Sequence, residues 1–306
     1  MSKVESLGQV AEWSKAAARK SCYTTQVVSE VRILPLSAKL IDCSNAQIGV
    51  KFLENENLVP PLGVENCSMM KIVKSWADEC RLLEKHVKQK ATDGAPLQIL
   101  EAGCGQNWPL DLKDVRFTLT GNDIDRGMLL LRKAKHNDLD EMIVGDLRFL
   151  NLEKHRYDVI YNSYVLEHID GAEGVLENFS NWLKPGGLLI LRIPDRNSVR
   201  GFVARNTPFW FHMFYVKYVL GFQDAGTTGV GPFRAFYDPI VSRAGIYEFC
   251  QKNRFIIKEE YGHGSHLESQ GIRGVLIYLF VRTVSLLSLG KLAWDHTDIT
   301  YVLEKE

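Results

Sequence analysis

The chain has 306 residues, of which 45% are hydrophobic and 24% are charged, a balance typical of a soluble globular protein. Lys and Arg together number 37, as do Asp and Glu, so no overall basic field favours binding to nucleic acid. The six cysteines are scattered without the paired spacing of a zinc site. We therefore expect reduced thiols, no metal and a cytoplasmic location.

The first sixty residues are expected to form a poorly ordered extension outside the functional core. No apolar core follows the basic start, so no secretory signal is predicted. Residues 10–16 read as the translated D-arm of a transfer RNA gene, and residues 31–34 as its translated T-loop. We hypothesise that residues 8–37 derive from such a gene. The functional domain is placed at residues 61–306, with a substrate-side insertion at about 195–240.

Beyond the extension, the spacing of apolar residues predicts helices and strands in alternation. A long helix at 66–90 is expected to pack against the core. Strands joined by helices of this length imply a parallel sheet that is covered on both faces. The strands are predicted at 97–101, 117–123, 142–146, 157–162, 188–193, 255–261 and 299–304, and further helices at 128–136, 172–183 and 242–252.

Two later segments break this pattern. Residues 195–239 are rich in aromatic side chains, which form either a satellite core or a pocket for an apolar substrate. Residues 272–289 are strongly apolar, but Arg273 and Arg282 interrupt them, so no integral membrane segment is predicted. We expect a buried helix there, with peripheral docking on a membrane surface as the alternative.

Acids and glycines follow the carboxyl ends of the predicted strands, where ligands bind in such sheets. The turn from Glu101 to Gly105 lacks the third glycine of a dinucleotide fingerprint, because Trp108 takes its place. A carboxylate before the first glycine repels a diphosphate but suits an ammonium group. Asp123 can accept both ribose hydroxyl protons, and Asp146 the adenine amino protons. The full set is Glu101, Gly103, Gly105, Asp123, Asp146 and Asn162.

These motifs resemble those of class I S-adenosylmethionine-dependent methyltransferases over about residues 95–195. They are most similar to the small-molecule group with a Val-Leu-Glu-His-Ile sequence, here Val165–Ile169. The resemblance implies an α/β Rossmann-like sheet of seven strands, mostly parallel with the last strand antiparallel. It also implies S-adenosylmethionine as cofactor, with Ile124 and Leu147 among the residues that hold it. The family's third glycine is Asn107 here, so the helix after the glycine turn is expected to be short or irregular.

The acceptor is predicted to be a small, fairly apolar metabolite, such as a phenolic, polyketide, quinone or lipid-like compound of secondary metabolism. Methylation on oxygen is favoured. A hydroxyl acceptor needs a base, and His168 is the first candidate, with His212 and His263 as weaker ones; a carboxylate acceptor needs none. The candidate substrate-binding residues are Tyr164, His212, Phe233 and Tyr237.

Two rival functions come from the same residues. The irregular glycine turn is compatible with an inactive or regulatory methyltransferase-like protein that binds the cofactor without turnover. A nicotinamide oxidoreductase is disfavoured by Glu101 and Trp108. The Asn/Asp-Pro-Pro-aromatic motif of DNA amino-methyltransferases does not occur at residues 162–165, which read Asn-Ser-Tyr-Val.

Overall fold

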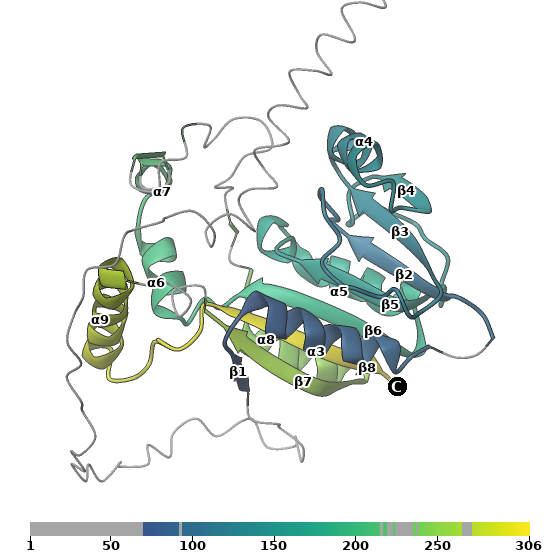
Figure 1. The fold of residues 1–306 in the computed structure, drawn as a ribbon. Coiled ribbons are helices and arrows are strands. Elements are labelled where there is room, and N and C mark those ends of the chain that lie inside the picture. Colours follow the sequence, from purple (N-terminus) through teal and green to yellow (C-terminus); the bar gives the residue numbers. More distant parts are fainter. Residues whose placement is uncertain are drawn as a thin grey trace, which may run out of the picture. The chain divides into compact units, whose positions relative to one another are not determined.

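A computed structural model describes residues 70–91, 94–214, 217–218, 223, 235–236, 238–264 and 271–306. These residues form one sheet with helices on both of its faces (Figure 1). The expected N-terminal extension, with its segment attributed to a transfer RNA gene, lies outside the described residues. So do two of the candidate substrate-binding residues, Phe233 and Tyr237.

Eight described strands pair in the order β1-β7-β8-β6-β5-β2-β3-β4. The strands are β1 (Lys71–Val73), β2 (Leu97–Ala102), β3 (Phe117–Asp123), β4 (Glu141–Val144), β5 (Tyr157–Ser163), β6 (Leu183–Pro194), β7 (Phe255–His263) and β8 (Asp298–Lys305). The helices are α3 (Trp76–Lys88), α4 (Arg126–Lys135), the short 3-10 helix η1 (Leu166–His168), α5 (Ala172–Trp182), α6 (Val199–Asn206), α7 (Phe209–Phe214), α8 (Arg243–Asn253) and α9 (Gly271–Leu287).

The sheet confirms the predicted fold class. All strands run parallel except β8, which lies antiparallel between β6 and β7. The count is eight rather than seven because β1 pairs with the outer edge of β7. The predicted helix at 66–90 is therefore wrong at residues 71–73. Ser75 caps α3 by accepting a hydrogen bond from the Asp78 N–H, so the helix begins only at Trp76.

The chain reverses direction across the sheet between β2 and β5. From β2 it moves outward to β3 and β4, and it then returns to place β5 on the other side of β2. The two central strands end together, because Ala102 is paired in register with Asn162. In an open parallel sheet such a switch point leaves a crevice beyond the carboxyl ends of the strands. The acids and glycines identified in the sequence lie at this edge.

Successive residues of a strand point alternately into two hydrophobic cores, one on each face of the sheet. On one face, Leu100 and Ala102 pack with residues of α5 and α8. On the other, Leu97 and Ile99 pack with residues of α3 and with Leu110 and Leu112 of an irregular segment. In Figure 1, α3 lies in front of β6, β7 and β8, and α8 lies behind them. Residues 103–116 contain turns but no helix, which confirms the irregular connection expected after the glycine turn.

The apolar helix near the C-terminal end differs from expectation in its burial. Helix α9 forms where the sequence predicts it, but its large side chains are exposed, by 79% at Ile272, 60% at Leu276 and 57% at Phe280. The expectation of a buried helix is wrong. Among the described residues, no helix is both long and apolar enough to cross a membrane.

The core on the α5 face yields a stability prediction. Phe179 is fully buried in this core, whereas Phe149 is 78% exposed. We expect Phe179→Ala to lower the free energy of unfolding by about 3–5 kcal/mol, because it removes a buried ring and leaves a cavity. The matched control, Phe149→Ala, should change it by less than about 0.5 kcal/mol. Urea denaturation of both variants measures the difference, and equal losses would contradict the assigned packing.

Candidate active site at the carboxyl ends of the strands

The turn after β2 is fixed by its glycines. Gly103 and Gly105 have φ angles of 74° and 56°, in the left-handed region that glycine adopts readily. A Cβ on Gly103 would lie 2.2 Å from Val165 Cγ2, whereas a Cβ on Gly105 would meet no heavy atom within 4 Å. The N–H groups of Gly103 and Cys104 both donate to the Asn122 carbonyl oxygen. The turn is thus held against β3, and Gly105 borders open space that a ligand can enter.

Behind this turn lies an ion pair that the sequence did not reveal. Arg132 of α4 is fully buried, and its Nη1 lies 2.6 Å from Glu101 Oε2. The same nitrogen donates to the Cys104 carbonyl oxygen at 3.1 Å, and the rest of the guanidinium contacts Asp138. Burial raises the pKa of the Glu101 carboxyl, and the neighbouring guanidinium partly offsets that rise. Arg132 therefore holds the glycine turn in place and reduces the negative charge behind it.

Asp123 ends β3 and faces the same turn. Its Oδ2 accepts a hydrogen bond from the Gly105 N–H at 3.0 Å, and its Oδ1 accepts one from the Asp125 N–H at 2.9 Å. Each carboxylate oxygen has a second lone pair, so both can also accept a hydroxyl proton. The two backbone bonds orient the carboxylate in advance for a vicinal diol such as a ribose.

Two exposed apolar side chains follow the ends of β3 and β4 in the chain, each near an acid. Ile124, next in the chain to Asp123, is 71% exposed. Phe149, three residues after Asp146, is 78% exposed. Arg148 pairs with the Asp146 carboxylate through its Nη2 at 2.7 Å and lowers the pKa of that acid. Leu147 is buried, and its carbonyl oxygen accepts a hydrogen bond from Asn178. Exposed apolar side chains near a carboxylate suit a planar base that carries an amino group.

Asn162 ends β5 directly opposite the glycine turn. Its Nδ2 donates to the Ala102 carbonyl oxygen at 2.9 Å, which fixes the orientation of the amide. Its Oδ1 is buried and has no hydrogen-bond partner in the part of the chain that the structure describes. A buried amide oxygen without a partner costs free energy, and an ammonium donor from a ligand would satisfy it. The strand ends therefore fit an adenosine group joined to an amino acid.

A second group of polar side chains lies at the ends of β6, β7 and β8. The Arg192 guanidinium lies 3.9 Å from the ring centroid of Trp76 and 4.8 Å from that of Tyr164. Its Nη2 is 3.1 Å from His263 Nδ1, and its Nε is 3.7 Å from the buried Glu79 carboxylate. Tyr164 has a φ of 55°, which is strained for a bulky residue and is found mainly at functional sites. The cluster therefore holds the Tyr164 ring at the strand ends.

His168 is the last residue of η1, four residues after Tyr164. Its side chain is one-third exposed, and its Nε2 is 3.8 Å from Glu167 Oε1. Burial raises the pKa of Glu167 to about 8, and its Oε2 has no hydrogen-bond partner among the described residues. The histidine is the more accessible member of the pair.

The two weaker histidine candidates lie in different places. His263 ends β7, is 4% exposed and belongs to the Arg192 cluster. His212 lies on α7, where its Nε2 is 2.6 Å from Thr207 Oγ1, so its partner belongs to the insertion itself. The structure thus places His168 and His263 at the strand ends. His212 instead contacts Thr207, which belongs to the insertion.

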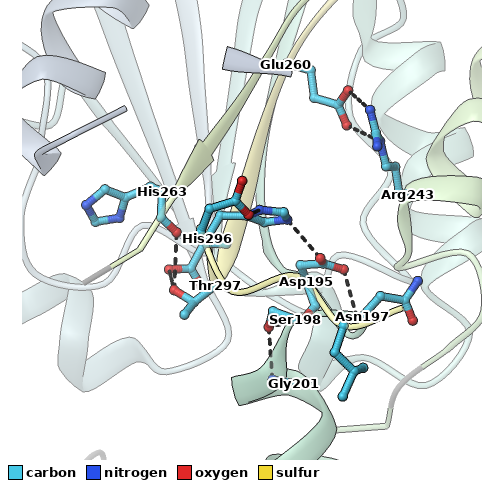
Figure 2. Close-up of polar contacts among 12 residues, drawn as sticks. Asp195, Asn197, Ser198, Gly201, Arg243, Glu260, His263, His296 and Thr297 are labelled. Atoms are coloured by element: carbon cyan, nitrogen blue, oxygen red, sulfur yellow. Dashed lines mark hydrogen bonds and ion pairs between the residues drawn. The ribbon is translucent and has the colours of Figure 1, made fainter. Parts of the chain in front are cut away.

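The chain that leaves β6 is braced by a buried histidine (Figure 2). His296 Nε2 lies 2.9 Å from Asp195 Oδ2, and its Nδ1 lies 2.8 Å from Asp295 Oδ1. Desolvation opposes the charged imidazolium, but the hydrogen bonds to the two carboxylates outweigh it and raise the pKa of His296 to about 9. The backbone adds a bond from the Asp195 N–H to the Thr297 carbonyl oxygen. This brace fixes the start of the insertion relative to β8.

The raised pKa of His296 predicts a pH dependence of stability. A group whose pKa is about 9 when folded and 6.5 when unfolded stabilises the fold fully below pH 6.5, and this contribution is lost as the pH rises through 9. We expect the difference in unfolding free energy between wild type and His296→Gln to shrink by about 3 kcal/mol over that window. Urea denaturation at several pH values measures it.

The matched control for this series is Thr297→Val. It removes the neighbouring buried hydroxyl, whose Oγ1 lies 2.9 Å from Asp298 Oδ2 and 3.2 Å from the His263 carbonyl oxygen, without removing a titrating group. Its loss of stability should be the same at each pH. A His296→Gln difference that also stays constant with pH would contradict the assigned charge.

Sequence reasoning missed three groups that the structure places at the site. Arg132 reads as a surface arginine, because it lies in a helix rich in Arg and Lys. In the sequence, Arg192 is one polar residue in an apolar strand. That pattern could have identified it as a buried arginine, which needs polar partners. Glu167 belongs to the Val165–Ile169 motif, but its burial depends on distant parts of the chain.

A comparison with protein families matches residues 75–219 to a family described as a methyltransferase domain. The match covers β2 to β6 together with α3, α6 and α7. It confirms the resemblance that the motifs indicated.

Curated relatives share about a quarter of their residues with the aligned part of this chain. A malonyl-[acyl-carrier protein] O-methyltransferase from Hahella chejuensis is 26% identical over 32% of this chain and 37% of its own length. A ubiquinone biosynthesis O-methyltransferase from Rickettsia typhi is 25% identical over 59% of this chain and 68% of its own length. A sterol 24-C-methyltransferase from Debaryomyces hansenii is 31% identical over 30% of this chain and 26% of its own length. The chain thus spans less than half the length of several of these relatives.

Solved structures with a similar fold include two further proteins. A putative S-adenosylmethionine-dependent methyltransferase from Listeria monocytogenes aligns with a TM-score of 0.48 at 14% identity, over 74% of this chain and 98% of that one. Magnesium protoporphyrin IX methyltransferase from Synechocystis aligns with a TM-score of 0.45 at 15% identity, over 74% of this chain and 82% of that one.

Proposed function

We propose that this chain, a member of the class I S-adenosylmethionine-dependent methyltransferase superfamily, transfers a methyl group from S-adenosylmethionine to an oxygen of a small, fairly apolar metabolite. The observation that supports this most is the Asp123 carboxylate. It is oriented by the Gly105 N–H at the switch point, with the open Gly105 turn and the unpartnered Asn162 amide oxygen beside it.

Each part of the cofactor has a matching group on the chain. Asp123 would accept the ribose hydroxyls, and Asp146 with the exposed Ile124 and Phe149 would hold the adenine. Asn162 Oδ1 would accept a proton of the ammonium group. Glu101 would act on the same group from a distance, since Arg132 already holds its Oε2. When bound, S-adenosylmethionine supplies an electrophilic methyl group, and most of the acceleration comes from aligning the acceptor oxygen with it.

The acceptor side is assigned to Tyr164 and the insertion that follows β6. Tyr164 is 38% exposed at the strand ends, and its ring would pack against an apolar acceptor. His212, Phe233 and Tyr237 are the further candidates of the insertion. The accessible imidazole of His168 would take the proton of an acceptor hydroxyl. The O-methyltransferases among the relatives support an oxygen acceptor.

A regulatory role that binds the cofactor without turnover is the second candidate. The glycine turn departs from the family pattern, with Asn107 in place of the third glycine and no helix in residues 103–116, and Arg132 already pairs with Glu101. Calorimetry with S-adenosylmethionine and S-adenosylhomocysteine tests both proposals. Absence of binding to either ligand would reject both functions. Binding without turnover on a panel of phenolic, quinone and polyketide acceptors would favour the regulatory one.

Replacing Asp123 tests the ribose contact. Asp123→Ala removes two charge-assisted hydrogen bonds to the ligand, so we expect the Kd for S-adenosylhomocysteine to rise by about 100-fold or more. Calorimetry measures the Kd. The control is Asp125→Ala, which removes the cap of α4 at the Gly127 N–H but no proposed ligand contact. Its Kd should stay within about threefold. Unchanged affinity in a folded Asp123→Ala protein would refute the assignment.

Replacing His168 tests the proposed base. With an acceptor found in the panel, His168→Gln should lower kcat by about 100- to 10,000-fold while the Kd of the donor stays the same. Steady-state kinetics and calorimetry separate the two effects. His155→Gln is the matched control, because His155 precedes β5 at the opposite edge of the sheet and contacts the Leu183 carbonyl oxygen. An unchanged kcat in His168→Gln would show that the acceptor needs no base from this residue.

A further inference from the structure

Helix α9 exposes large apolar side chains and buries small residues. Among its described residues, the two that are buried, Gly274 and Ser285, are small. At 100° per residue, these two positions lie on one side of the helix. The seven most exposed of its large apolar side chains share an arc of about 140° on the opposite side, whereas Ile277 and Tyr278, 38% and 41% exposed, lie outside this arc. This exposed arc, called here the α9 face, comprises Ile272, Val275, Leu276, Leu279, Phe280, Leu286 and Leu287, which are between 54% and 79% exposed.

Helix α9 packs on α6. Small residues let two helices approach closely. The anchoring is polar and local: Ser285 Oγ donates to the Leu292 carbonyl oxygen, and the Val199 N–H donates to the Ala293 carbonyl oxygen. The α9 face is therefore fixed outward by the fold, and it is larger than the scattered apolar residues of an ordinary surface.

The segment of α9 and the segment of its neighbour α6 are basic and aromatic in sequence. The helix and the residues after it, 271–294, contain Arg273, Arg282 and Lys291 but no acid. The segment that carries α6 and α7, residues 196–223, contains four basic residues and no acid. All 37 acids of the chain thus lie outside these two segments. Exposed Trp210 and Tyr218, both more than 60% exposed, belong to the same acid-free part.

From these observations we infer that the α9 face docks on an anionic lipid bilayer. An exposed apolar helix face, in segments that carry basic residues, Trp and Tyr but no acid, matches the chemistry of a headgroup region. A helix of 17 residues is about 25 Å long, shorter than the hydrocarbon core, so it would lie along the surface. A second copy of the chain fits less well, because it would bring two basic surfaces together.

The placement of α9 relates this surface to the proposed site. Helix α6 begins five residues after β6 ends, and Ser198 forms a β-bridge with Ala293 in the segment after α9. The docking surface is thus joined to the carboxyl ends of the strands through this short connection (Figure 1). The inference does not depend on the proposed function, because bilayer binding needs neither donor nor acceptor.

Vesicle flotation of the full chain tests the inference. We expect the chain to float with vesicles of phosphatidylcholine mixed with phosphatidylglycerol, and less with phosphatidylcholine alone. Salt at about 1 M should weaken binding, because it screens the basic residues. Leu276→Ser/Phe280→Ser replaces two side chains of the α9 face and should lower the partition coefficient at least about tenfold.

The matched control is Leu82→Ser/Leu130→Ser, which replaces two exposed leucines of α3 and α4. It should float as the wild type does, and circular dichroism and Tm establish that both double variants fold. Absence of binding to the mixed vesicles would overturn the inference, as would equal losses in the two variants. So would light scattering that shows a dimer which Leu276→Ser/Phe280→Ser dissolves, because the face would then be a protein interface.

Discussion

The geometry of the proposed cofactor site depends on the buried contacts of Arg132. This side chain reaches from α4 to Glu101 at the end of β2, to the carbonyl oxygen of Cys104 in the glycine turn and to Asp138. No helix follows the glycine turn among residues 103–116, so the turn lacks the support that such a helix would supply. Removing one partner of a buried ion pair leaves an uncompensated charge, which typically costs about 3–5 kcal/mol. Arg132 thus couples the stability of the fold to the shape of the turn.

The irregular segment after the turn has its own packing. Trp108 lies where a dinucleotide fingerprint has its third glycine, and its ring packs edge-on against Tyr161 with centroids 5.6 Å apart. Leu110 and Leu112 continue the same core. The segment therefore covers this face of the sheet with side chains rather than with a helix. A bulky indole in this place leaves no close backbone approach for a diphosphate, in keeping with a ligand that carries none.

The sequence predicted the central strands well, because their signals are local. The predicted strand 117–123 coincides with β3. The position of the acids at the ends of the strands could be predicted from the order of the strands alone. Strand β1 was missed because three residues at an edge pair with β7, almost two hundred residues away. The burial of α9 was predicted wrongly for a related reason. An apolar run indicates a helix, but it does not indicate that the buried residues would be Gly274 and Ser285. Arg132 and Arg192 likewise depend on distant partners.

The central claim is that the switch point between β2 and β5 holds S-adenosylmethionine, and a crystal structure with S-adenosylhomocysteine tests it most directly. The account predicts both ribose hydroxyls within hydrogen-bond distance of the Asp123 carboxylate. It also predicts the ligand's ammonium group near Asn162 Oδ1 and the adenine against Ile124 and Phe149. A ligand bound elsewhere, or one whose ribose is turned away from Asp123, would contradict it.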